Sequence, residues 1–205
     1  TYGSSFWMPK TSSVGGAVSK SSWQAVSISP AVVTSGSQSL YYDKNSSVNL
    51  AAGSYSSLSV SKGSTVYLSS GVYNFTTARF DSNVRIVADT SAGDVIINTA
   101  KSFTTSQQVK FVTSGSGNTY IVSAGSFAID KHNEIAASIL ANTTGSVAQS
   151  TTINGLVYAN NSLQLGNGVE ISGLSSISSP AVPEPATALL LLSGIPLLKR
   201  RNKRA

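Results

Sequence analysis

The sequence predicts an all-β protein whose body is a parallel β-helix or solenoid, followed by a hydrophobic helix at the C-terminus. Three observations point to this architecture. Short β-type runs alternate with Gly, Ser and Asn every eight to twelve residues from Val48 onward. Apolar patterns recur at a spacing of eighteen, or of twenty-three to twenty-five, positions. Charged residues make up only 11% of the 205 residues, whereas hydrophobic residues reach 40%, enough to close a core.

Residues 1–45 are predicted to be an irregular segment in front of the body. Trp7, Met8 and Trp23 stand isolated among Ser, Gly and Thr. Such aromatic residues can form a platform for stacking on sugars, or they can anchor a terminal segment on the domain. The anchoring interpretation is favoured, because it is the commoner use of isolated aromatic residues.

Residues 46–174 form the predicted solenoid body. Its expected strands alternate apolar and small polar residues, as half-buried strands do. The clearest examples are residues 58–60, 65–68, 84–87, 94–97, 109–112, 119–122 and 155–158. Residues 134–141 fit either a helix or a buried strand, because they show no clear amphipathic face.

Repeated spacings favour stacked coils. Three spacings equal eighteen positions: Gly53-x-Tyr55 to Gly71-x-Tyr73, Val66-x-Leu68 to Val84-x-Ile86, and Ile153-x-Gly155-Leu156 to Ile171-x-Gly173-Leu174. In the middle the spacing is longer: Phe80, Phe103 and Phe127 are twenty-three and twenty-four positions apart, and Val84-x-Ile86-Val87 recurs after twenty-five as Val109-x-Phe111-Val112. A coil of eighteen positions makes three strands of about 20 Å, and longer intervals indicate longer turns. An antiparallel β-sandwich or jelly roll is the alternative, because chance matches are frequent in a Ser- and Gly-rich chain.

The charge distribution argues against nucleic-acid binding. The formal net charge is +6, but five basic residues lie in the last seven positions, so residues 1–198 carry nine basic and eight acidic groups. A nucleic-acid binder would show a basic stripe on the folded domain. The chain has no cysteine, which excludes disulfides, thiolate catalysis and Cys-based zinc sites. Neither a cofactor nor a metal ion is expected.

His132 lies in the densest charge cluster of the body, between Asp130 and Glu134. As a general base it would be oriented by one of these two carboxylates. Adjacent residues of an extended chain point to opposite faces, however, so the cluster is interpreted as a solvated turn.

Asp81, Asp89 and Asp94 lie between expected strands, where a β-helix polysaccharide lyase or hydrolase would place its acids. Paired carboxylates must converge on one sugar at about 5 to 10 Å. Nothing in the spacing requires such convergence, and Asp is also a common turn residue. No catalytic residue is therefore assigned.

The C-terminal residues 182–205 follow a Ser-rich linker, residues 175–181, and have three parts. The first part is the motif Val182, Pro183, Glu184 and Pro185. The second is the apolar run 186–198, with Ala186, Leu189, Leu190, Leu191, Leu192, Ile195, Leu197 and Leu198. The third is basic, with Lys199, Arg200, Arg201, Lys203 and Arg204.

The apolar run suits a transient membrane segment. Its thirteen residues span about 20 Å as a helix, against a hydrocarbon core of about 30 Å, and Gly194 and Pro196 weaken that helix. The basic residues behind it should stay cytoplasmic, so the body would be held on the other side of the membrane. Pro183 and Pro185 block helix continuation and leave an extended segment that a membrane-embedded enzyme can reach.

This arrangement resembles the PEP-CTERM sorting signal of Gram-negative bacteria. The resemblance is confined to residues 182–205 and is carried by Val182–Thr187, Leu189–Leu192 and Lys199–Arg201. It implies export, an inner-membrane intermediate, processing by an exosortase near the Pro-Glu-Pro, and release to the outer envelope or the extracellular matrix. Two departures are Ala186, where Ser is common, and Pro196 inside the short span. The alternative is a generic tail anchor or an apolar C-terminal β element.

We therefore expect an exported structural or adhesive protein of the cell surface or extracellular matrix, associated with exopolysaccharide or biofilm, and not an enzyme. The body is similar to uncharacterised β-solenoid surface domains that often accompany such tails. The expected partners are the exosortase, the membrane during processing, and exopolysaccharide. A polysaccharide-degrading β-helix enzyme with the same tail is the alternative. An ice- or mineral-binding surface would need regular Thr-x-Thr ladders, which are not seen. Since no signal-peptide pattern is present and export requires one, we expect either that the signal has been removed before Thr1 or that the sequence is a fragment of a longer chain.

Overall fold

A computed structural model of the chain describes residues 5–7, 13–14, 33–34 and 36–172. All regular structure in these residues is β, and every strand pair in them is parallel. The chain divides into two compact units, Thr1–Leu174 and Ser175–Ala205, and all the described residues belong to the first. Within the described part, there is no helix of the length and apolar character needed to cross a membrane.

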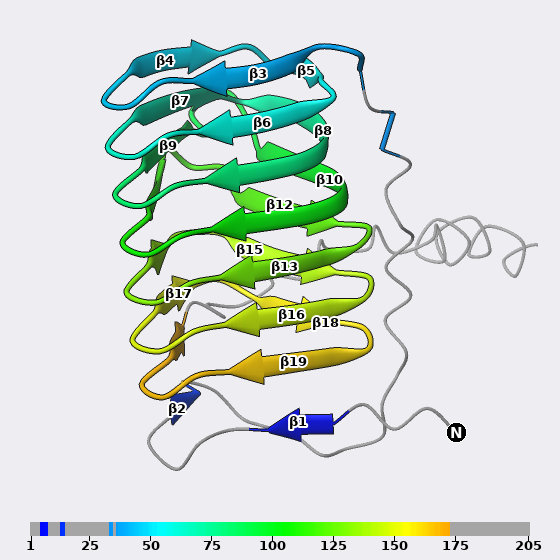
Figure 1. The fold of residues 1–205 in the computed structure, drawn as a ribbon, viewed down its shortest axis with the longest axis vertical. Helices are drawn as coiled ribbons and strands as arrows, with labels where there is room; N and C mark the ends of the chain where they lie inside the picture. Colours follow the sequence, from blue (N-terminus) through cyan, green and yellow to red (C-terminus); the bar gives the residue numbers. More distant parts are fainter. Residues whose placement is uncertain (1–4, 8–12, 15–32, 35, 173–205) are drawn as a thin grey trace, which may run out of the picture. The chain divides into compact units, whose positions relative to one another are not determined.

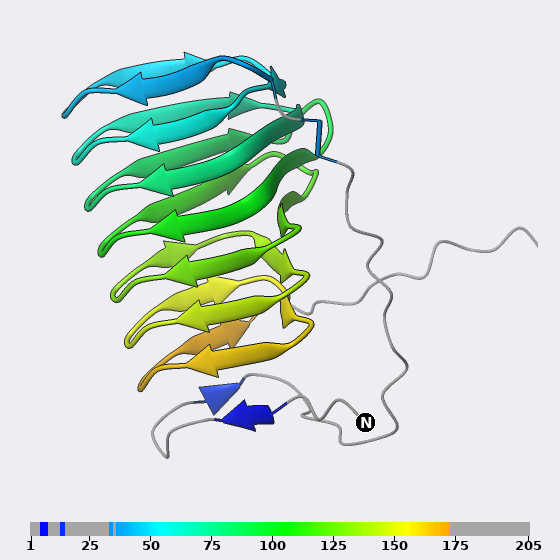
Figure 2. The same cartoon turned by 45° about the vertical axis from the view of Figure 1, so that its right-hand side comes forward.

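The strands wind into a β-solenoid of seven coils with three faces, here called A, B and C (Figures 1 and 2). Face A contains β3 (Ser39–Tyr42), β6 (Ser57–Val60), the second parts of β8 (Gly71–Phe80) and β10 (Val95–Thr105), β13 (Ser126–Ile129), β16 (Thr144–Val147) and β19 (Ser162–Leu165). Face B contains β4 (Ser47–Leu50), β7 (Thr65–Ser69), β9 (Arg85–Asp89), β11 (Lys110–Ser114), β14 (Glu134–Ile135), β17 (Thr152–Asn154) and β20 (Glu170–Ser172). Face C contains β5 (Gly53–Ser54), the first parts of β8 and β10, β12 (Thr119–Ser123), β15 (Ser138–Ala141) and β18 (Val157–Ala159).

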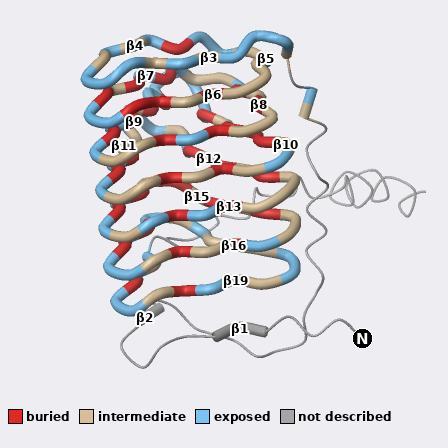
Figure 3. Tube along the Cα trace, viewed as in Figure 1, coloured by how far each residue is buried: buried red, intermediate tan, exposed pale blue. Residues whose placement is uncertain are grey.

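One apolar core runs along the axis of the solenoid. Buried and more exposed residues alternate along most strands, because successive side chains of a strand point to opposite faces (Figure 3). The inward residues of one coil lie in register with those of the next. On face B the inward row is Val48, Val66, Ile86, Phe111, Ile135, Ile153 and Ile171.

The corner between faces A and B is the most regular part of the fold. Each coil has one residue there with φ between 54° and 75°: Asn45, Gly63, Asn83, Gln108, His132, Ser150 and Gly168. In the first six coils the backbone N–H of this residue donates to the next coil, as His132 N does to Gln149 O at 3.1 Å. Eight positions separate the inward residues of faces A and B in every coil, for example Leu58 from Val66.

Coil length varies mainly at the corner between faces B and C. Along face A the register joins Leu40, Leu58, Ala78, Phe103, Phe127, Gly145 and Leu163. The successive intervals are therefore eighteen, twenty, twenty-five, twenty-four, eighteen and eighteen positions. Most of the extra residues lie in loops 90–94 and 115–118, which are joined by the bond from Asn118 N to Asp94 Oδ1 at 2.8 Å.

The predicted repeat is correct at three of its spacings, and wrong near the start of the body and from Phe80 to Phe103, where the interval is twenty-five and not twenty-three. The pairs Ile86–Phe111, Phe103–Phe127 and Ile153–Ile171 confirm intervals of twenty-five, twenty-four and eighteen positions. Near the start the interval is twenty, because Gly53 pairs with Tyr73 and Val66 with Ile86. Phe80 pairs with Thr105, although its ring contacts that of Phe103 at 5.5 Å between centroids.

The parallel pairing confirms the solenoid and excludes an antiparallel sandwich or jelly roll for the described residues. Residues 134–141, which fit two interpretations, form strands β14 and β15. The first coil begins with β3 at Ser39, inside the range 1–45 assigned to an irregular segment. The predicted C-terminal helix, residues 186–198, lies outside the described residues.

Two N-terminal strands extend the solenoid beyond its seventh coil. The strand β1 (Ser5–Trp7) pairs with β19, and β2 (Ser13–Val14) pairs with β20. Phe6 and Val14, the register partners of Leu163 and Ile171, are again eight positions apart. Together β1 and β2 are called the N-terminal coil below.

Candidate functional site

Face A carries an uninterrupted column of hydroxyl side chains on its outer surface. One register row holds Ser or Thr in all seven coils: Ser39, Ser57, Thr77, Ser102, Ser126, Thr144 and Ser162. These residues are called the hydroxyl column. All seven are exposed or half-buried. Neighbouring strands of a sheet lie about 4.8 Å apart, so the column repeats a hydroxyl at that spacing.

The alternation of each strand explains why these hydroxyls point outward. In β6 the buried residues are Leu58 and Val60, which leaves Ser57 and Ser59 on the outer side. The second outward row of face A is mixed: Tyr41, Ser59, Arg79, Thr104, Ala128, Ser146 and Gln164. Both rows together are called the hydroxyl face. Its single cation, Arg79, pairs with Asp81 at 3.4 Å, so the hydroxyl face is close to neutral.

The hydroxyl column is free to bind a ligand. A Ser or Thr hydroxyl donates one hydrogen bond and accepts others. Within the described residues, none of the seven side-chain hydroxyls forms a hydrogen bond to another protein group. Each is therefore available to water or to the hydroxyls of a polymer.

The other two faces differ in chemistry from the hydroxyl face. One outward row of face B is charged in the middle coils, where Lys110 pairs with Glu134 at 2.5 Å. Face C begins with a ladder in which Asn98 Nδ2 donates to Asn74 Oδ1 at 3.0 Å and Asn74 Nδ2 to Ser54 Oγ at 3.1 Å. Apolar residues are also exposed or half-buried on face C, both beside the ladder in β8 and β10 and in the later coils: Val72, Ile96, Tyr120, Val122, Leu140 and Leu156.

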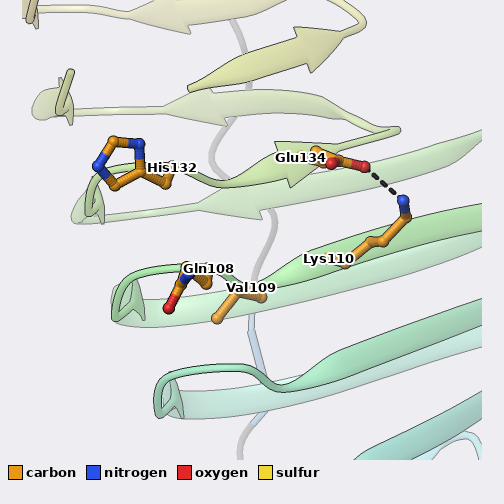
Figure 4. Close-up of a pocket in the computed structure, with 5 residues that line it drawn as sticks. All are labelled: Gln108, Val109, Lys110, His132 and Glu134. Atoms are coloured by element: carbon orange, nitrogen blue, oxygen red, sulfur yellow. Dashed lines mark ion pairs between the residues drawn. The ribbon is translucent and has the colours of Figure 1, made fainter. Parts of the chain in front are cut away.

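The His132 cluster forms a shallow, open hollow. The hollow has a volume of about 480 Å³ and is lined by Gln108, Val109, Lys110, His132 and Glu134 (Figure 4). The Glu134 carboxylate pairs with Lys110, and the Asp130 carboxylate accepts from the backbone N–H of Lys131 at 2.8 Å. Neither carboxylate hydrogen-bonds the His132 ring within the described residues. With φ at 60° in the corner of its coil, His132 confirms the turn interpretation.

The three aspartates of the enzyme alternative have local partners. Asp81 pairs with Arg79, and Asp94 accepts from Asn118 N. The Asp89 carboxylate accepts hydrogen bonds from Ser91 Oγ at 2.6 Å and from Ser91 N at 3.0 Å. Both bonds lower the pKa of this carboxyl, and the bond from Ser91 Oγ has the larger effect. Asp81 precedes β9 and Asp89 ends it, so a strand of about 16 Å separates these two carboxylates. The strand thus separates Asp81 from Asp89, whereas Asp89 and Asp94 flank one loop, whose ends are held together by Ser70 Oγ through Asp89 O and Gly93 O.

The predicted sorting residues cannot be located in the fold, because 182–185, 186–198 and 199–204 all lie outside the described residues. No group of three or more His, Cys, Asp or Glu side chains in the described part could hold a metal ion.

Sequence reasoning missed the hydroxyl column, although a signal for it exists. Each member lies six positions before the positive-φ residue of its coil, as Ser57 does before Gly63 and Ser126 before His132. Alignment of the coils on that corner would have revealed the column. Comparisons of the chain with protein-family models, with curated proteins and with solved structures found no match.

Proposed function

We propose that the protein is an exported structural or adhesive protein of the cell surface or extracellular matrix, whose hydroxyl face binds neutral exopolysaccharide. Residues 182–205 direct it there as a PEP-CTERM sorting signal. The observation that carries the binding proposal is the hydroxyl column, one Ser or Thr in each of seven coils. The sorting proposal rests on the tripartite tail.

A regular row of hydroxyls suits a long neutral polymer better than a small ligand. A single exposed hydrogen bond contributes only about 0.5 to 1.5 kcal/mol, because it replaces a bond to water. Contacts to successive units of one polymer are intramolecular after the first, so weak contacts accumulate along the column. A nearly neutral face offers a polyanion no charge to bind, which favours a neutral polysaccharide.

The binding proposal predicts that alanine substitutions on the hydroxyl column weaken polysaccharide binding. Replacement of Ser57, Ser102, Ser126 and Ser162 by Ala removes four hydroxyls without changing the inward residues of face A. We expect the affinity of the full chain for dextran, a neutral polysaccharide, to fall at least about tenfold. Affinity electrophoresis in gels that contain dextran measures the change, and alginate in place of dextran gives the polyanion comparison.

The matched control carries four alanines on face B, in place of Ser47, Ser69, Thr152 and Ser172, all of which are exposed. This control should migrate like the unmodified chain in dextran gels. Equal weakening in both variants, or no retardation of the unmodified chain by dextran, would contradict the binding proposal.

The sorting proposal predicts a shortened mature protein. Cleavage near Pro-Glu-Pro would remove the residues from about Pro185 onward, and with them five of the fourteen basic residues. Intact-mass measurement on protein from the envelope or the culture supernatant tests this directly. Mature protein that still ends in Lys199–Ala205 would refute processing and leave a simple tail anchor.

The arrangement of the acidic residues supports a non-enzymatic role over the polysaccharide-degrading alternative. A glycosidase needs two carboxylates within about 10 Å across one sugar, and one of them must hold a proton. Asp81 directly follows β8 and Asp89 ends β9, so the strand β9 lies between them, and the lowered pKa of Asp89 favours its ionised form. An acid of this kind is poorly suited to donate a proton to a leaving group.

A further inference from the structure

Both ends of the solenoid carry unpaired strand edges in the described part of the chain. At the first coil, β3, β4 and β5 pair on one side only, with β6, β7 and β8. Leu40, Tyr42 and Val48 stay half-buried there, with Leu40 and Tyr42 packed on the core, and Tyr41 is 68% exposed. At the other end, β1 and β2 also pair on one side only, with β19 and β20. Exposed strand edges are templates for another chain.

The N-terminal coil repeats the pattern of the first coil. In both, a face A strand is followed by a face B strand, and their matching residues are eight positions apart: Phe6 and Val14, Leu40 and Val48. Residues 5–14 and 39–48 are identical at five of ten positions: Ser5 and Ser39, Lys10 and Lys44, Ser12 and Ser46, Ser13 and Ser47, Val14 and Val48. The N-terminal coil, which ends the stack, therefore has the strand order and spacing needed to stack on the first coil of another copy.

We propose that copies of this protein associate end to end, with the N-terminal coil of one copy pairing in parallel with the first coil of the next. The expected register joins Phe6 to Leu40 and Val14 to Val48 of the neighbouring copy. The half-buried apolar residues of the first coil would then be covered, and the hydroxyl column would continue across the junction. Such a head-to-tail contact uses two different surfaces and does not close on itself, so it builds filaments. This inference is independent of polysaccharide binding and of sorting.

The backbone of the first coil has the polarity that this contact requires. Thr65 N donates to Ser46 O at 2.8 Å, so the backbone groups of Ser46 face the second coil. These groups alternate along a strand, so the N–H groups of Ser47 and Asn49 face away from the second coil. Between coils, an N–H bonds the carbonyl before its register partner, as Arg85 N does with Ser64 O. By the same rule, Asn49 N of the next copy would donate to Val14 O in the N-terminal coil of the first copy.

Crosslinking of two introduced cysteines tests the contact, since the natural chain has none. The full chain with Ser13→Cys and Ser47→Cys, kept in mild detergent because of its apolar run, is treated with a short bismaleimide. Within one chain the two positions lie about seven coils, roughly 34 Å, apart, so a crosslink inside one chain is excluded. We expect a ladder of dimers, trimers and larger species on denaturing gels, growing with protein concentration.

Two comparisons decide whether the ladder reports the proposed register. The pair Ser13→Cys and Ser91→Cys places the second cysteine on an exposed loop of the third coil, and it should give no ladder. Adding Asn49→Pro to the Ser13→Cys and Ser47→Cys chain removes the outward N–H, and the ladder should be lost while the circular dichroism spectrum stays unchanged. If the chain with Ser13→Cys and Ser47→Cys gives no ladder at any concentration, the proposal is overturned. This outcome does not depend on the proline variant. An equal ladder in the Ser91 control overturns it as well.

Discussion

Gly145→Val is expected to lower the free energy of unfolding by about 3 kcal/mol, the upper end of the usual cost of overpacking a core. Gly145 is the register partner of Phe127 on face A, and no side chain separates it from the phenyl ring. A Cβ at position 145 would lie 2.5 Å from Phe127 Cε1 and 3.0 Å from Leu163 Cδ1. The new side chain would therefore push both neighbours out of their packing. Urea unfolding followed by circular dichroism measures the loss.

A double-mutant cycle identifies the cause of this loss. Phe127→Ala alone should cost about 3 to 5 kcal/mol, because it leaves a cavity in the core. In the double variant the valine occupies part of that cavity, so the combined loss should be smaller than the sum by at least about 1 kcal/mol. Additive losses would show that the two positions do not share one space.

Asn133→Val is expected to cost about 3 kcal/mol through lost hydrogen bonds. The Asn133 side chain is 1% exposed and donates to Thr105 Oγ1 at 2.7 Å and to Asp130 O at 3.0 Å. Its Oδ1 accepts from Val109 N at 2.6 Å. Each of these three bonds contributes about 1 kcal/mol net, and buried groups that lose a partner add to the cost.

Valine is the appropriate substitution because the same corner position already accepts it in other coils. Val84, Val109 and Val169 each follow the positive-φ residue of their coil, as Asn133 does. The change should therefore remove hydrogen bonds without a steric penalty. Asn154→Val on the exposed side of β17 is the control and should stay within about 0.5 kcal/mol. Equal effects in both variants would contradict a role of the buried bonds.

The fold class could be predicted from the sequence because the core rows are periodic, whereas the register could not be predicted throughout. The spacing is constant between faces A and B and variable between faces B and C. Gly53-x-Tyr55 and Gly71-x-Tyr73 match in sequence, but Gly53 is the partner of Tyr73. Tyr55 instead stacks on Phe75, with ring centroids 5.5 Å apart. A match taken from the variable side thus gave an interval two positions short.

The candidate site was beyond sequence reasoning for a different reason. Serine and threonine are so frequent in this chain that a column of hydroxyls does not stand out until the coils are aligned. The interval between neighbours in the hydroxyl column is twenty-five positions from Thr77 to Ser102, but eighteen from Ser39 to Ser57. No single period joins all the members. The three parts of the tail are instead contiguous in sequence, so the sorting signal could be proposed without any alignment of coils, and it stays a prediction.

The constant eight-residue arc between faces A and B separates the positions where a change of length would alter the outer rows from those where it would not. Insertions and deletions at the corner between faces B and C change the circumference of a coil but leave the arc intact. A change of length at a loop such as 90–94 therefore leaves the spacing between the outer rows of faces A and B as it is. The arc thus fixes the position of the outer row of face B relative to that of face A, whatever the circumference of the coil.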